Sequence, residues 1–154
     1  IVRSQGDAGQ WWWHFDARSG RVVEGYPVYS VHQDSMAPMA LLALQDACGV
    51  DSRDAIERGL QWLKSSPEIG GKSLIDPKAD LIWRKVSRHE PGKLVRGLQA
   101  AVSRVHPSAR APIVGLLFRP GFIDHECRPY HPGWILHAFN PSRLEAWTTP
   151  ERSM

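Results

Sequence analysis

The sequence lacks the run of roughly 20 apolar residues that a membrane-spanning helix needs, so we expect no membrane span. It also lacks a long basic block. Its 19 basic and 16 acidic residues give a net charge of +3, and they are scattered along the chain. A positive excess spread this thinly is typical of a solvated surface, so nucleic acid is not an expected partner.

Cysteine is scarce, and several catalytic motifs are missing. Cys48 and Cys127 stand far apart, and the sequence shows no signal peptide. These features favour a reducing compartment and predict a cytoplasmic protein. There is no Gly-rich phosphate loop, no GxSxG nucleophile elbow and no HExxH zinc motif. No motif therefore names a reaction.

The sequence is rich in residues that shape turns and pockets, with 13 glycines, 12 prolines and seven tryptophans. Glycine and proline predict many turns between regular elements, and a length of 154 residues favours one domain. We expect a flexible segment over residues 1–10, a single domain over 11–140 and a peripheral tail over 141–154. Because the chain begins with Ile1 rather than Met, the remainder of a longer chain is one expected partner.

Hydrophobic periodicity predicts several helices. Residues 36–48 are apolar on nearly every side and stop at Gly49, which predicts a buried helix. A second, amphipathic helix begins after Asp51 or Ser52, and the two form an α/α-hairpin. The segments after Pro91 and over residues 134–139 predict further helices, each preceded by a segment that contains histidine.

Two β-hairpins are predicted beside these helices. Aromatic and β-branched residues flank one turn between residues 11–16 and 21–23, and another between 74–76 and 81–83. A two-stranded ribbon is only marginally stable alone, so both ribbons should lie on the helices. The predicted fold class is mainly α: an α/α-hairpin domain with short β-hairpins at one end.

The first candidate site is His32-Gln33-Asp34, directly before the predicted buried helix. A helix N-terminus offers unpaired N–H groups and a positive potential, which would hold Asp34 ionised. Asp34 and His32 are therefore candidate catalytic residues for acid–base work or for stabilising a cation. In the alternative interpretation Asp34 only caps the helix, and His32 bonds a backbone carbonyl.

The second candidate site is a group of four potential metal ligands within eight residues: Asp124, His125, Cys127 and His131. Zinc favours Cys and His around a tetrahedral centre, so Asp124, Cys127 and His131 are candidate ligands and zinc is a candidate cofactor. The spacing is not a CxxC pair, and a chance grouping is the alternative.

The third candidate is the aromatic run Trp11-Trp12-Trp13-His14-Phe15-Asp16. Aromatic rings can line a pocket for an apolar or sugar ligand, or they can face a cation. The candidate substrate-binding residues are Trp11, Trp12, Trp13, Tyr26, Tyr29 and Tyr130. His14 and Asp16 join the candidate catalytic residues. The alternative is that these rings form the hydrophobic lid of a hairpin packed on helices.

These features resemble the terpenoid cyclase and protein prenyltransferase superfamily over residues 10–139. Gln10-Trp11 and Gln61-Trp62 are similar to the Gln-Trp pairs of squalene-cyclase repeats. The segment 128–131 is similar to the Tyr-His segment that carries a zinc-binding histidine in prenyltransferase β-subunits. The resemblance implies an α/α toroid, of which this chain would be a C-terminal part or a reduced version. The Asp-x-Asp-Asp motif of class II terpene cyclases is absent.

The leading hypothesis is an enzyme, or the catalytic half of one, that acts on an isoprenoid-like apolar substrate in an aromatic-lined cavity. The reaction implied by the resemblance is cyclisation or prenyl transfer. One alternative is a toroid hydrolase or lyase acting on a saccharide, with its acid and base found among Asp16, Asp34, Asp76 and Glu90. Another alternative is an interaction module without catalysis.

Overall fold

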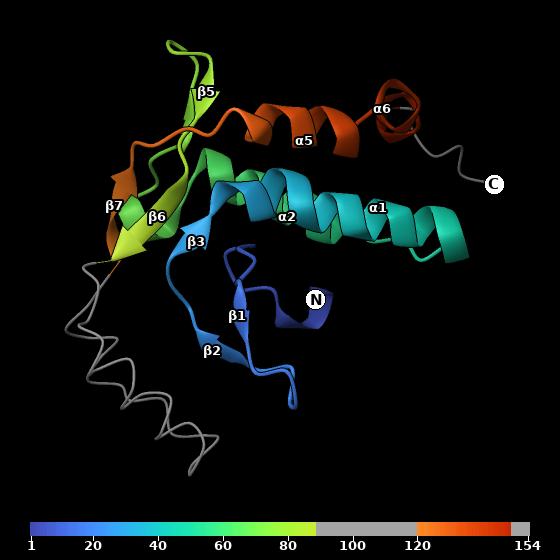
Figure 1. Ribbon diagram of the computed structural model, residues 1–154, viewed down its shortest axis with the longest axis horizontal. Coiled ribbons are helices and arrows are strands. Elements are labelled where there is room, and N and C mark those ends of the chain that lie inside the picture. Colours follow the sequence, from blue (N-terminus) through green and yellow to red (C-terminus); the bar gives the residue numbers. More distant parts are fainter. Residues whose placement is uncertain (89–119, 149–154) are drawn as a thin grey trace.

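The computed structural model describes residues 1–88 and 120–148. Its α-helices are α1 (Ala37–Cys48), α2 (Arg53–Lys64), α5 (Tyr130–Ala138) and α6 (Pro141–Thr148). Its strands are β1 (His14–Phe15), β2 (Val22–Glu24), β3 (Val28–Tyr29), β4 (Ile75–Asp76), β5 (Leu81–Ile82), β6 (Lys85–Arg88) and β7 (Pro120–Asp124). Short 3-10 turns span Val2–Ser4 and Pro67–Ile69, and a π-helical turn spans His32–Met36. Figure 1 shows α1 and α2 side by side, with α5 lying along them.

The prediction of a mainly α, toroid-like fold is wrong. The described residues form four short α-helices and three small antiparallel sheets, with strand orders β1-β2, β3-β6-β7 and β4-β5. The pairing of β3 with β6 joins Val28 to Val86, and β6 pairs with β7 in turn. These contacts link distant parts of the sequence, so local periodicity does not reveal them. The protein is a small mixed α and β domain.

The local turn and helix signals are confirmed. β1 pairs with β2, and β4 pairs with β5, as two antiparallel hairpins. Gly49 ends α1 with a φ of 71°, a left-handed conformation that glycine adopts without steric cost. Ser52 precedes α2, whose buried residues lie on one face as its amphipathic pattern requires. The helix expected after Pro91 lies outside the described residues.

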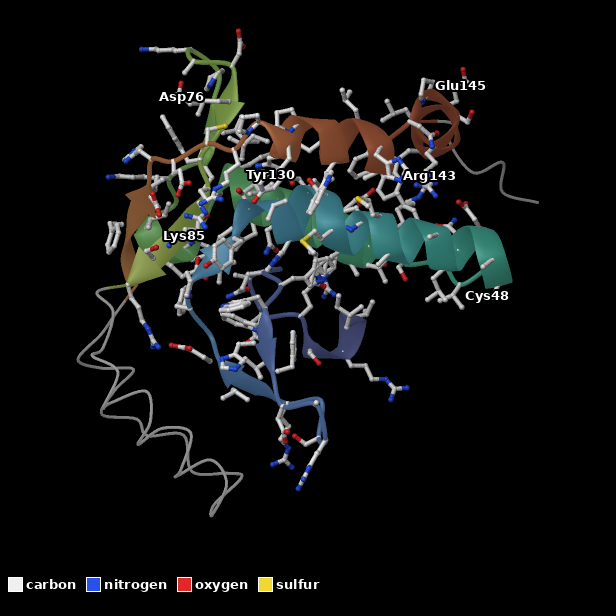
Figure 2. The ribbon with its side chains drawn as sticks, viewed as in Figure 1. Cys48, Asp76, Lys85, Tyr130, Arg143 and Glu145 are labelled. Carbon is white, nitrogen blue, oxygen red and sulfur yellow. The ribbon has the colours of Figure 1, made fainter. Side chains whose placement is uncertain are left out.

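The prediction that the helix over residues 36–48 is buried on all sides is wrong. Leu41 and Leu42 are buried, whereas Leu44 is 45% exposed. The helices α2 and α5 both contact α1, and an apolar composition does not by itself bring a partner to the rest of its surface. Figure 2 shows Cys48 at the end of α1 that lies far from Tyr130.

The helical segment also begins earlier than predicted, because Ser30 and Val31 are already helical. In the π-helical turn His32–Met36 that follows, the Ala37 N–H donates to the His32 carbonyl. The buried side chain of Gln33 fixes this turn: its amide group donates to the Trp11 and Tyr29 carbonyls and accepts from the Trp11 N–H. Asp34 therefore lies inside a helical turn and is not the helix cap. π-helical turns occur often at functional sites.

Two apolar clusters form the core. One contains Trp11, Ala37, Leu41, Leu42, Ala55 and Ile56, and the other contains Val28, Trp62, Leu63, Ile69, Leu74 and Val86. The first lies between α1 and α2, and the second lies between α2 and the strands. Trp11 and Trp62 are at most 2% exposed, so both rings are core residues.

The two ends of the described chain pack on this core. In residues 1–10, expected to be flexible, Gln5 Nε2 donates to the Ala55 carbonyl of α2. In the tail, expected to be peripheral, α6 brings Trp147 against the first cluster, and Arg143 pairs with Asp46 at 2.6 Å. Within the described part of the chain, no helix is long and apolar enough to cross a membrane.

Candidate functional site

The candidate site centres on a buried pair formed by Asp34 and His131. His131 Nε2 lies 2.6 Å from Asp34 Oδ1, although the two residues are 97 positions apart in the sequence. Asp34 is 3% exposed and His131 is 4% exposed. Ser35 Oγ donates to the same Asp34 oxygen at 2.6 Å. The hydrogen bond fixes the orientation of the imidazole ring.

Two elements bring this pair together. The π-helical turn carries Asp34, and the first turn of α5 carries His131, whose N–H donates to the Arg128 carbonyl. Asp34 Oδ2 is buried and has no hydrogen-bond partner among the described residues. The His131 side chain has no second hydrogen bond in the described part of the chain, which leaves its Nδ1 available for proton transfer.

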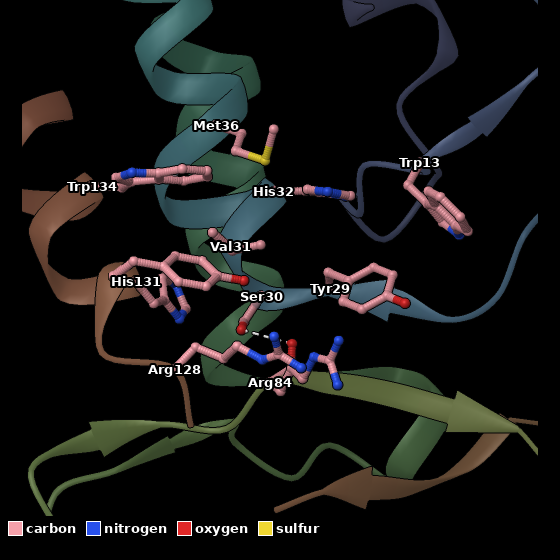
Figure 3. A pocket seen from close by; sticks show the side chains of 11 residues that line it. Trp13, Tyr29, Ser30, Val31, His32, Met36, Arg84, Arg128, His131 and Trp134 are labelled. Carbon is pink, nitrogen blue, oxygen red and sulfur yellow. Dashed lines mark hydrogen bonds between the residues drawn. The ribbon is translucent and has the colours of Figure 1, made fainter. Parts of the chain in front are cut away.

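A pocket of about 230 Å³ adjoins the pair, and His131 is part of its wall. Four aromatic residues line it: Trp13, Tyr29, Tyr130 and Trp134. The other lining residues are Ser30, Val31, His32, Met36, Arg84, Arg128 and His131. Figure 3 shows Met36 and Trp134 at one end of the pocket and the two arginines at the other, with the histidines between them.

Glu126 holds the two arginines in place. Arg84 Nη1 donates to its Oε2, and Arg128 Nε donates to its Oε1 at 2.7 Å. Burial alone would raise the pKa of Glu126, but the hydrogen bonds and charges of Arg128 and Arg84 hold it below its ordinary value. The Arg84 guanidinium also lies over the Tyr29 ring, 5.5 Å from its centroid.

His32 lies in the same pocket, where burial favours its neutral form. Its ring centroid is 5.4 Å from that of Tyr29. Burial lowers the pKa of His32 below its ordinary value, although the charge of Asp34 opposes this shift. A lowered pKa keeps the imidazole neutral at pH 7, so His32 is a ring donor or acceptor rather than a cation.

Five of the residues that the sequence singled out therefore meet at the pocket: Trp13, Tyr29, His32, Tyr130 and His131. Asp34 lies directly behind His131. The structure gives Asp34 a role that capping does not describe, because its carboxylate bonds a side chain from a distant helix.

The other residues of the aromatic run lie elsewhere. Asp16 caps the turn between β1 and β2, where hydrogen bonds from Ser19 and Arg18 lower the pKa of its carboxyl. His14 is exposed and faces Glu24, 3.6 Å from its carboxylate. Trp12 packs edge-on against Tyr26, and both rings pack against the second core cluster. With Trp11 in the core, these rings fit the interpretation of a packed lid.

The candidate zinc ligands do not form a metal site, because two of them bond other residues and the third is exposed. Asp124 on β7 pairs with Lys85 at 3.3 Å, His131 bonds Asp34, and Cys127 is exposed. The described part of the chain contains no group of three or more His, Cys, Asp or Glu side chains placed to hold a metal ion. These residues do not fit a zinc site, and we propose none.

Sequence reasoning missed Arg84, Arg128 and Trp134 as pocket residues. Arg128 and Trp134 stand within four positions of Tyr130 and His131, so proximity to those residues could have identified them. Arg84 follows a predicted hairpin and carried no signal. It reaches the pocket because its carbonyl accepts from both the N–H and the Oγ of Ser30.

No protein-family model, no curated protein and no solved structure matches the chain.

Proposed function

We propose that the pocket is the active site of an enzyme that transfers a proton to or from a small apolar molecule of the isoprenoid type. His131 is the acid–base group, and Asp34 orients its ring and stabilises the imidazolium. The observation that carries the proposal is the buried Asp34–His131 hydrogen bond at the wall of an aromatic pocket.

The aromatic wall supports an apolar substrate. Trp13, Tyr29, Tyr130 and Trp134 line the cavity with ring faces and edges. Such rings bury apolar ligand surface, and they attract the positive charge that forms when a carbon–carbon double bond is protonated. This matches the chemistry of an isoprenoid better than that of a saturated apolar ligand.

A saccharide hydrolase is less well supported. Retaining and inverting glycosidases use two carboxyl groups on either side of the bond that they cleave. Among the described residues that line the pocket there is no Asp or Glu. Asp16 and Asp76 belong to exposed hairpin turns, where their carboxylates accept from nearby backbone N–H groups. Glu90, the last member of that set, lies outside the described residues.

Deuterium uptake tests the proposal directly. The protein is incubated in D₂O with geraniol, geranic acid and geranyl phosphate, and incorporation into recovered compounds is followed by mass spectrometry. We expect uptake into at least one of the three, and a fall of about 100-fold or more in His131→Gln, as for loss of a general acid–base group.

The matched control is His137→Gln, because His137 lies in the same helix and is exposed. This variant should keep the parent rate. Equal uptake in His131→Gln and in the parent protein would contradict the proposal, and so would binding of the compounds without any uptake.

A further inference from the structure

Arg84 and Arg128 lie together at one end of the pocket, and the proposed proton transfer uses neither. Both donate to the same carboxylate, that of Glu126. Figure 3 shows their guanidinium groups next to each other, on the side of the pocket opposite Met36 and Trp134.

The charges at this end do not cancel. Two guanidinium groups share one carboxylate, which leaves one positive charge in excess. The neighbouring cation Lys85 has its own partner in Asp124. Arg84 and Arg128 line the pocket and Glu126 does not, so the carboxylate neutralises the pair from behind and the excess charge faces the cavity.

At this end of the pocket, hydrogen bonds and an aromatic contact hold Arg84 in place. The Arg84 carbonyl accepts from Ser30, its N–H donates to the Glu126 carbonyl, and its guanidinium lies over Tyr29. Arg128 uses Nε for Glu126, and its two terminal amino groups have no partner among the described residues. A guanidinium with two free N–H₂ groups matches the geometry of an oxyanion.

We infer that the ligand of this pocket is an organic anion, whose carboxylate or phosphate group binds Arg128 and Arg84 while its apolar body lies against Trp134 and Met36. This inference rests on the proposed function and narrows its substrate class from apolar molecules to anionic ones. The spacing also places the body of the ligand beside His131, between the two ends of the cavity.

Three probes with the same carbon skeleton test the inference: geraniol, geranic acid and geranyl phosphate. Their affinities for the full chain are measured by calorimetry at low salt. We expect the anions to bind about tenfold more tightly than geraniol, because each charge-assisted hydrogen bond contributes on this scale. The tighter of the two anions identifies the group that the arginines recognise.

Arg128→Gln should remove this preference and leave the affinity for geraniol unchanged. Arg18→Gln is the control, since Arg18 is exposed in the turn between β1 and β2. Arg128→Lys keeps the charge without the fork of donors, so it should retain part of the preference and serves if the glutamine variant does not fold.

Equal affinity for geraniol and the two anions would overturn this inference and leave the proposed function standing. An unchanged preference in Arg128→Gln would also overturn it. Conversely, a preserved preference together with normal deuterium uptake in His131→Gln would overturn the proposed function alone. Binding of none of the three probes would overturn both.

Discussion

Glu68 and Asp34 are two carboxylates that the fold surrounds with hydrogen-bond donors, and they differ in what those donors are. Glu68 accepts from Gln10 Nε2, Tyr26 OH and Trp62 Nε1, which are all neutral groups. Asp34 accepts on one oxygen from Ser35 and His131, and its other oxygen has no partner among the described residues.

This difference distinguishes Glu68, a carboxylate that stabilises the fold, from Asp34, a carboxylate that we propose supports catalysis. Burial and the charge of Glu68 raise the pKa of Tyr26, so this hydroxyl stays protonated and always donates. The Glu68 cluster ties the N-terminal segment to α2 through Gln10 and Trp62. Asp34 instead bonds an imidazole ring that borders a cavity.

The largest expected effect is the loss of stability when Glu68 is replaced. Glu68→Leu leaves three partly buried donors without an acceptor, which should lower the free energy of unfolding by about 3 kcal/mol. Urea unfolding measures this value. Glu57→Leu is the control, because Glu57 is exposed on α2 and should change stability by less than about 0.5 kcal/mol.

Equal stability of the two variants would mean that the Glu68 cluster is not structural. The folded fraction of Glu68→Leu should still bind geraniol with the affinity of the parent protein.

A smaller effect is expected at the pocket wall. Trp134→Ala removes an aromatic ring that is already 38% exposed and that lines the pocket. The substitution should therefore lower ligand affinity more than stability. We expect geraniol to bind roughly fivefold more weakly, or about 1 kcal/mol. Calorimetry measures it, with Leu136→Ala as the control on the same helix, where Leu136 is 73% exposed. If Leu136→Ala weakens binding equally, the pocket is not where geraniol binds.

The smallest expected effect is on the pH dependence of stability. The folded pKa of His32 is lowered, so below about pH 6.5 the unfolded chain binds this proton first and stability falls. Above that pH both states are neutral and His32 contributes no pH dependence. His32→Gln should therefore lose less stability than the parent protein between about pH 7.5 and pH 5, as followed by urea unfolding. An unchanged slope of unfolding free energy against pH in His32→Gln would contradict the lowered pKa of His32.

The sequence predicted the features that depend on near neighbours. Gly49 and Ser52 mark the turn between α1 and α2, and Asp16 and Asp76 sit in the turns of the two confirmed hairpins. In each case the turn chemistry of a few residues decides the backbone conformation. This is why the αα-hairpin and both ribbons were predictable.

The features that depend on distant neighbours were not predictable. Nothing near β3 indicates that it pairs with β6, because sheet pairing depends on long-range packing. The early start of the helix at Ser30 was hidden for a similar reason, since Gln33 stabilises the π-helical turn through Trp11 and Tyr29. The sequence indicates His131 as a candidate metal ligand and Asp34 as a candidate catalytic residue beside His32, so it does not indicate that Asp34 and His131 form a pair. Their pairing follows from α5 packing on the π-helical turn.

Asp34→Asn provides the most direct test of the central claim, that Asp34 serves the chemistry of His131. Asparagine has the shape of aspartate and keeps the hydrogen bonds to Ser35 and His131, so unfolding free energy should fall by only about 1 kcal/mol. Deuterium uptake should fall about 100-fold, because the neutral amide no longer stabilises the imidazolium. Full uptake together with a loss of stability as large as in Glu68→Leu would show that Asp34 is a second structural carboxylate, and would contradict the account.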